Sequence, residues 1–167
     1  ITEHPPQVSG IPAQTIQEGG TFTAISLENY LTELDGDAVI WSYSGASELE
    51  VNIDGSNQAT VSVPNENWAG VDTVIFTATD DDEFQFTGSD TVVFTVNGLN
   101  DAPVVANSIS NQTAFEDSAY SFTFSDSVFS DVDTGDELTF SATLANGSAL
   151  PSWLNFESQT ARTFSGT

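Results

Sequence analysis

Acidic side chains gather in the short polar stretches of this sequence. The acids with the most suggestive spacing are Asp35, Asp37, Glu66 and Asp80 in the first half, and Asp133 and Asp136 in the second. Carboxylate and carbonyl oxygens in loops suit Ca²⁺, which takes about six to eight oxygen ligands in flexible geometry. Zinc and copper favour Cys and His, and the chain has no Cys and a single His, His4. The residue types therefore favour a calcium site.

The charge balance of the chain is extreme. It has 25 Asp and Glu against one Arg and no Lys, which gives a net charge of −24. Such a chain repels nucleic acid phosphates and anionic membranes, so neither is an expected partner. A solvated acidic surface would explain the composition by itself. Because Asp35 and Asp37 recur as Asp133 and Asp136 at matching places in the two halves, we favour bound cations.

Alternating apolar and polar residues predict strands that are half buried in a sheet. The segments that alternate are 12–17, 21–27, 38–43, 49–54, 59–64, 72–80 and 90–98. They are rich in Val, Ile, Thr and Phe, they are separated by Gly, Asn, Asp and Pro, and no window carries a helical stripe. The first half therefore predicts a seven-strand antiparallel β-sandwich with the acids in its loops.

The chain repeats itself at an offset of 98 residues. "IPAQTIQEGGTF" (11–22) aligns with "ISNQTAFEDSAY" (109–120), and "ELDGDAVIWSY" (33–43) aligns with "DVDTGDELTFSA" (131–142) after one insertion. This predicts two related domains, residues 1–99 and 104–167, joined by a linker at 100–103. Nothing in the second copy matches the last two strands of the first. We therefore expect that copy to be truncated, with an open edge and half a core unless a partner chain completes it.

Two other kinds of chemistry compete with cation binding as interpretations of the sequence. Tryptophans can stack on sugar rings, and Trp68 is the best candidate because it lies in a polar loop. The patterns around Trp41 and Trp153 favour core packing instead. The only His, His4, lies in a lead that we expect to be disordered, so a Ser-His-Asp arrangement has little support. The sequence therefore predicts a protein that is not an enzyme.

Several of these motifs together resemble a known family. Glu18 and Glu116 open the two copies, Asp35-Gly36-Asp37 precedes a strand, Asp80 ends another, and "NDAP" (100–103) joins the halves. This combination resembles bacterial cadherin-like tandem repeats. The second copy, with "LPSWLNF" and "RTFSGT", resembles the dystroglycan-type cadherin-like domain. The resemblance implies an all-β fold of tandem Ig-like/cadherin-like Greek-key β-sandwiches, the second one incomplete.

The resemblance also implies where calcium binds, since such repeats hold Ca²⁺ where consecutive domains meet. At the internal junction the implied ligands are Glu18, Glu66, Asn100, Asp101, Asp133 and Asp136. Asp35, Asp37 and Asp80 would face a preceding domain. The linker is less acidic than in animal cadherins, so one or two ions are expected at the junction rather than three.

The function implied is that of a rigid spacer or adhesion module in a large extracellular bacterial protein, secreted or anchored to the cell surface. Its partners would be neighbouring cadherin-like repeats and a cell-surface or polysaccharide ligand, with no membrane insertion in this segment. Calcium sites of about 10⁻⁴ to 10⁻³ M would fill only outside the cell. The alternatives are a carbohydrate-binding accessory module of a secreted polysaccharide-degrading enzyme, and calcium-dependent dimerisation through the open edge.

Overall fold

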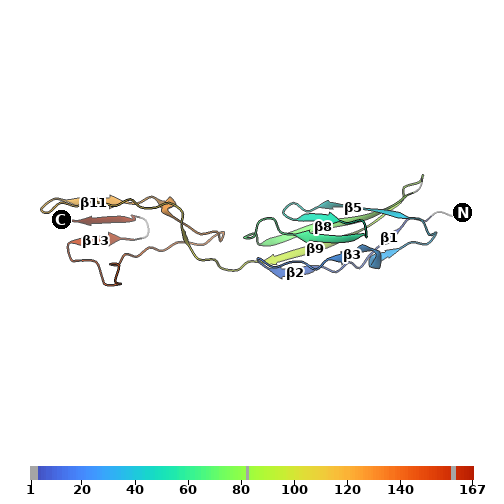
Figure 1. Ribbon diagram of the computed structural model, residues 1–167, viewed down its shortest axis with the longest axis horizontal. Helices are drawn as coiled ribbons and strands as arrows, with labels where there is room; N and C mark the ends of the chain where they lie inside the picture. Colours follow the sequence, from blue (N-terminus) through green and yellow to red (C-terminus); the bar gives the residue numbers. More distant parts are fainter. Residues whose placement is uncertain (1–3, 82, 159–160) are drawn as a thin grey trace. The chain divides into compact units, whose positions relative to one another are not determined.

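The computed structural model describes residues 4–81, 83–158 and 161–167. It divides into two compact units, which we call unit 1 (1–99) and unit 2 (100–167) (Figure 1). Every regular element in the described residues is a strand or a short 3-10 helix. This confirms the predicted all-β, Ig-like sandwich class. In the same part of the chain, no helix is long and apolar enough to cross a membrane.

The described residues of unit 1 form nine strands in three sheets. The elements are β1 (Gln7–Val8), β2 (Gln14–Gln17), β3 (Ile25–Ser26), η1 (Leu27–Tyr30), β4 (Leu31–Thr32), β5 (Val39–Gly45), β6 (Glu50–Ile53), β7 (Gln58–Ser62), β8 (Gly70–Asp80) and β9 (Thr87–Asn97). The largest sheet has the order β2-β9-β8-β5 and faces a sheet of order β3-β7-β6. Among the strand pairs of these described residues, only the pairing of β2 with β9 is parallel. The short pair β1-β4 was not predicted from the sequence.

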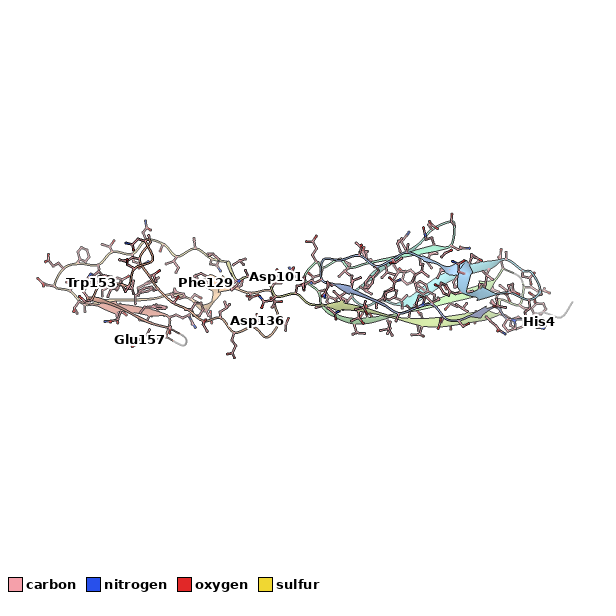
Figure 2. All side chains as sticks on the ribbon, turned by 90° about the horizontal axis from the view of Figure 1, so that it is seen from below. His4, Asp101, Phe129, Asp136, Trp153 and Glu157 are labelled. Atoms are coloured by element: carbon pink, nitrogen blue, oxygen red, sulfur yellow. The ribbon has the colours of Figure 1, made fainter. Side chains whose placement is uncertain are left out.

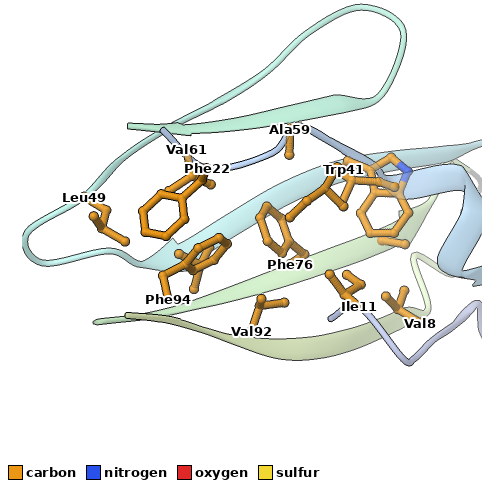
Figure 3. Close-up of a cluster of buried hydrophobic side chains, with 14 of the residues drawn as sticks. Val8, Ile11, Phe22, Trp41, Leu49, Ala59, Val61, Phe76, Val92 and Phe94 are labelled. Carbon is orange, nitrogen blue, oxygen red and sulfur yellow. The ribbon is translucent and has the colours of Figure 1, made fainter. Parts of the chain in front are cut away.

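The core of unit 1 lies between these two sheets (Figure 3). Every second side chain is buried from Asp72 onward in β8 and from Val92 to Val96 in β9, and the two strands form the middle of the large sheet. Phe76 and Phe94 are fully buried, and the Phe22 ring meets Phe94 edge to face at 4.9 Å. Trp41 enters the same core from β5 at 8% exposure, which confirms its predicted packing role. The alternation of apolar and polar residues along each strand therefore gives each sheet one buried face.

The predicted strand at 21–27 is the main departure in unit 1. Only Ile25 and Ser26 pair with β7. The Gln14 side-chain amide bonds both the N–H and the C=O of Thr23, at 2.8 and 2.9 Å. A side chain therefore satisfies backbone groups that a neighbouring strand would otherwise satisfy.

Unit 2 repeats part of this plan. Its elements are β10 (Val104–Val105), β11 (Tyr120–Thr123), η2 (Asp126–Val128), β12 (Phe129–Ser130), β13 (Leu154–Glu157) and β14 (Thr163–Gly166). The sheet β11-β14-β13 has the order of β3-β7-β6, and β10-β12 corresponds to β1-β4. Five phenylalanines form its aromatic cluster, at ring distances of 4.6 to 6.1 Å: Phe124, Phe129, Phe140, Phe156 and Phe164. Two segments of the repeat, 112–115 and 138–142, are outside any sheet.

Candidate cation-binding sites

The short pair β10-β12 positions the acids at one end of unit 2. β10 directly follows the linker 100–103, and β12 directly precedes the loop 131–136. Since Val104 pairs with Ser130, the linker and the acidic loop start from the same end of the same ladder. The Asp101 N–H accordingly donates to Asp133 Oδ2 at 2.6 Å. Two strand residues on each side are enough to bring together groups that are 32 residues apart.

Three carboxylates of this loop converge. Asp131, Asp133 and Asp136 each offer an oxygen, and these oxygens all lie within 4.8 Å of one another. The Asp133 N–H donates to Asp131 Oδ1 at 3.1 Å, and the Asp136 N–H donates to the Asp133 carbonyl at 3.3 Å. Gly135 has φ +101, a conformation that favours glycine, and so permits the turn. Asp101 and Asp136 lie at the same end of unit 2 (Figure 2).

The electrostatics of this cluster are unfavourable without a counter-ion. Two like charges at 4.8 Å repel by about 1 kcal/mol in bulk water and by about 3.5 kcal/mol at an effective dielectric of 20. The chain has only one Arg to offset 25 acids, and the salt bridge found among the described residues involves His4 and Asp35. The cluster is therefore a place where a divalent cation would remove repulsion.

Unit 1 carries the same arrangement at its own end. β1 pairs with β4, which brings residue 4 beside the loop 33–38. The His4 N–H donates to Asp35 Oδ2 at 2.6 Å, the same bond and length as Asp101 to Asp133. The Asp35 N–H donates to Glu33 Oε1 at 3.2 Å, as Asp133 does to Asp131 at 3.1 Å. His4 is thus ordered by this bond, and the expectation of a disordered lead was wrong at this residue.

The carboxyls of Glu33 and Asp35 influence each other's pKa. The Asp35 side chain is only 6% exposed, and Asp35 Oδ1 and Glu33 Oε2 are buried without a hydrogen-bond partner. The neighbouring Asp35 carboxyl raises the pKa of Glu33. The Glu33 carboxyl and the His4 N–H favour the anion of Asp35 and lower its pKa. Sequence reasoning missed Glu33, although it aligns with Asp131 in the repeat.

Two further predicted ligands lie close to this loop along the backbone. Asp80 is the last residue of β8, is 2% exposed, and pairs with Val39 at the start of β5. The Asp81 N–H donates to the Ala38 carbonyl at 2.8 Å, which fixes the end of β8 against the loop. Asp37 is exposed. The loop 33–38 and the end of β8 therefore form one acidic end of unit 1.

The predicted ligands Glu18 and Glu66 belong to unit 1 as well. Glu18 Oε2 accepts from the Leu99 N–H at 2.9 Å, so Glu18 holds the last residue before the linker. Glu66 is exposed and lines a cavity of about 210 Å³ with residues 19–22 and 61–63. Among the described residues, only Asp131, Asp133 and Asp136 form a group of three or more converging acids. The joint use of Glu18 and Glu66 with the acids of unit 2 remains a prediction.

Asp72 shows that a buried acid here need not serve a cation. It is 8% exposed, and it accepts from the Glu48 N–H at 2.8 Å and the Thr73 N–H at 2.7 Å. Burial by itself raises its pKa, but these amides, with help from the Ser47 hydroxyl, make the net shift downward. Asp72 therefore pins the loop between β5 and β6, a structural role.

The tryptophans are distributed differently from the prediction. Trp68 is partly buried against the core, and its ring lies against Gly70, where an added Cβ would approach it to 3.0 Å. Trp153, expected in the core, is 46% exposed. With Phe115 and Tyr120 it lines a cavity of about 400 Å³ that also includes Glu116 and Asp117. Trp153 is thus more accessible than Trp68 for stacking against a sugar ring.

Comparison with known proteins adds a family for the second half. Residues 102–167 match a family model described as "Putative Ig domain". Unit 2 is an Ig-like domain. A solved structure described as a nucleoside hydrolase-related hypothetical protein from Saccharophagus degradans, associated with carbohydrate metabolism, is similar at 18% identity and a TM-score of 0.46. The similarity covers 57% of this chain and 26% of that one. No curated protein matches the chain.

Proposed function

We propose that this chain is a non-enzymatic, calcium-binding pair of cadherin-like repeats that acts as a stiff spacer or adhesion module of an extracellular bacterial protein. The observation that carries the proposal is the convergence of Asp131, Asp133 and Asp136 within 4.8 Å, beside the Asp101 amide. Calcium bound there would fasten the linker to the Ig-like domain. Within this proposal, the domain is of the dystroglycan type.

The duplication of the arrangement supports a selected site rather than general acidity. Both units use a two-residue strand pair, an amide from the preceding segment and a carboxyl bonded at 2.6 Å. The turn of each loop contains a glycine of positive φ, Gly36 in unit 1 and Gly135 in unit 2. An acidic coat that served only solubility would not need matching backbone geometry.

Calcium suits this site better than zinc or copper. The cluster offers only oxygen donors from a loop, which is the ligand type that Ca²⁺ prefers and that tolerates irregular geometry. Sites of this kind bind at about 10⁻⁴ to 10⁻³ M in extracellular modules, so they fill where calcium is millimolar. This is the basis for proposing an extracellular location.

The test is a calcium titration followed through the backbone amide signals of residues 99–103 and 131–136. We expect saturation at millimolar calcium, with Asp133→Asn weakening the affinity at least about tenfold because it removes one charged ligand. Asp126→Asn is the matched control, since Asp126 is an exposed acid of the same unit outside the cluster. Equal losses in the two variants would instead indicate a diffuse acidic surface.

The stiffening role requires its own measurement. Small-angle scattering profiles of the chain with calcium and with EDTA should differ if the ion fixes residues 100–103, and the Asp133→Asn profile should not respond to calcium. Profiles that superimpose while the titration still shows binding would keep the calcium site and remove the spacer role.

A second candidate is sugar binding, favoured by the exposed Trp153 beside a cavity lined by Tyr120, Glu116 and Asp117. An aromatic face with nearby carboxylates is a common way to hold a sugar ring and its hydroxyls. A glycan array probed with the chain and with Trp153→Ala tests this role, with Trp68→Ala as the control. A hit that Trp153→Ala does not weaken would count against this cavity.

A further inference from the structure

The outer face of the large sheet in unit 1 carries no charged side chain among the described residues. Alternation along β5, β8 and β9 places one set of side chains in the core and the other set outside. We call the outer set the neutral face: the even positions 40–44 of β5 and the odd positions 71–79 of β8 and 87–95 of β9. All of these residues are Thr, Ser, Val or Ile. The register aligns them in rows, since Thr77 pairs with both Ser42 and Ser89.

The acids of these strands point the other way. β8 and β9 contain three of them, Asp72, Asp80 and Asp90, all at positions that alternate with the neutral face. Asp72 and Asp80 are buried, and Asp90 Oδ2 accepts from the Ile11 N–H at 2.9 Å. Acidic side chains ordinarily take the solvent side. The preference of Thr for strands explains a hydroxyl-rich outer face, but it does not explain why the charges lie on the inner side.

The charge of the chain limits how two copies can meet. With one Arg and no Lys, carboxylates brought together from two copies have almost no cation to pair with, and their repulsion opposes association. A hydroxyl both donates and accepts, so Thr and Ser of one copy can bond Thr and Ser of another. The outer face of the β3-β7-β6 sheet is less suitable, because it carries Glu50.

We propose that the neutral face is a self-association surface, on which two copies of this chain pack sheet against sheet around a two-fold axis. In such an interface the same patch meets itself, which suits groups that are self-complementary. Ile75 and Val93 lie in the hydroxyl rows at 36% and 38% exposure and would supply apolar contact. The surface is separate from the acidic corners and from the open edge of unit 2, so this association does not require calcium.

The size of the neutral face fits a weak, reversible dimer. Since residues 71–79 pair with 87–95 and β5 lies beside them, the face is about 30 Å long and about 15 Å wide at the usual strand rise and spacing. Two such faces would together bury on the order of 1,000 Å², which is at the low end for a specific complex. The acids elsewhere on the two copies still repel, so added salt should strengthen the dimer by screening them.

A neutral polysaccharide is the other uncharged partner to consider, and the neutral face suits it less well. Sugar rings are commonly held by stacking on an aromatic ring. The neutral face contains no aromatic residue, because Trp41 and Tyr43 of β5 occupy the alternate positions. A second copy of the chain is therefore the better match.

The test is sedimentation equilibrium of the full chain in EDTA, over a series of protein and sodium chloride concentrations. We expect a monomer–dimer equilibrium whose association constant rises with salt. Thr91→Glu should lower that constant about tenfold or more, because the two-fold axis brings a new carboxylate into the interface from each copy. The matched control is Thr60→Glu, the same change at an exposed strand position on the other sheet, which should lower it less than about twofold.

Thermal melts check that both variants fold. If Thr91→Glu melts below the control, Ser44→Glu on the edge strand β5 replaces it with the same expected loss, since Ser44 is an exposed residue of the neutral face.

Four results would overturn the proposal. The chain stays monomeric at high salt, or the dimer dissociates in EDTA at equal ionic strength. A dimer that Thr91→Glu leaves intact would place the contact elsewhere, for instance at the apolar groove of unit 2 lined by Phe140, Phe156 and Phe164. A monomer whose binding to a neutral glycan is lost in Thr91→Glu would make a sugar the occupant. The calcium titration at 131–136 reads none of these results, so the two proposals fail independently.

Discussion

Unit 1 and unit 2 share the hydrogen bonds of their acidic corners, but among the described residues three converging acids occur only in unit 2, and the two cores differ. The corner needs only a two-residue strand pair and a loop, so it forms in both units with the same 2.6 Å amide bond. The core needs four strands in one sheet, and only unit 1 has them. The comparison teaches that a local acidic corner can form in a domain whose hydrophobic face is still open.

The two corners also differ in burial. The Asp35 side chain is 6% exposed, and the Asp35 N–H donates to Glu33 Oε1. The cluster of unit 2 is half-buried at Asp131 and Asp133 and exposed at Asp136. Because burial strengthens electrostatic interactions, an ion at the corner of unit 1 should gain more from each ionised carboxylate.

The largest expected effect tests the closed core against the open one. Phe76→Ala should destabilise unit 1 by about 3 to 5 kcal/mol, because Phe76 is fully buried and leaves a cavity. Phe156→Ala should cost unit 2 less than about 2 kcal/mol, because its groove is already open to solvent. Denaturant unfolding followed at residues of each unit measures both. Equal costs would mean that the groove is covered in solution.

Calcium should stabilise both units by a smaller amount. At calcium 100-fold above its dissociation constant, each bound site adds about 2.7 kcal/mol to the free energy of unfolding. Asp133→Asn should reduce this gain in unit 2 alone, to about 1.4 kcal/mol or less when the affinity falls tenfold or more, and Asp35→Asn should reduce the gain in unit 1 alone. Thermal melts with calcium and with EDTA measure the gain. Glu50→Gln, an exposed strand acid with the same charge change, is the control for unit 1.

Asp72 allows a pH test in unit 1, since the internal repeat gives unit 2 no counterpart. Asp72→Asn should cost about 2 kcal/mol at pH 7, because amides that bonded a carboxylate meet a neutral group. The pKa of Asp72 is lowered in the folded state, so its contribution is complete above the unfolded pKa near 3.8 and is lost as the pH falls through the folded value. The difference between wild type and variant should therefore shrink in acid, and a constant difference would contradict the charge-based explanation.

The smallest effect concerns a pair of matching glutamines. Gln14 bonds both backbone groups of Thr23, whereas Gln112 bonds only Ser110 two residues away. Gln14→Ala should cost unit 1 about 1 kcal/mol, and Gln112→Ala should stay within about 0.5 kcal/mol for unit 2. Denaturant midpoints of the two variants measure the contrast. A larger cost for Gln112→Ala would show that unit 2 forms the same bridge in solution.

Much of the fold could be predicted from the sequence because strand alternation is a local signal. The segments 72–80 and 90–98 became β8 and β9, which begin a few residues earlier than predicted. The strand predicted at 21–27 is shorter in the structure, because the Gln14 side-chain amide bonds the backbone of Thr23 where a neighbouring strand would otherwise do so. The exposure of Trp153 was also missed, because an apolar "WLNF" run does not reveal whether a facing strand is present.

For the candidate sites, the sequence by itself determined the residue types, their spacing and their repetition at an offset of 98, since these are properties of the chain alone. Only the tertiary structure decided which acids meet. The pairs β1-β4 and β10-β12 bring residues about 30 positions apart to 2.6 Å, add Glu33 to the corner, and order His4. Such pairings depend on contacts between distant segments, and the local alternation of apolar and polar residues does not predict them. The open groove of unit 2 has the same origin, because a strand is buried or exposed according to what lies across from it.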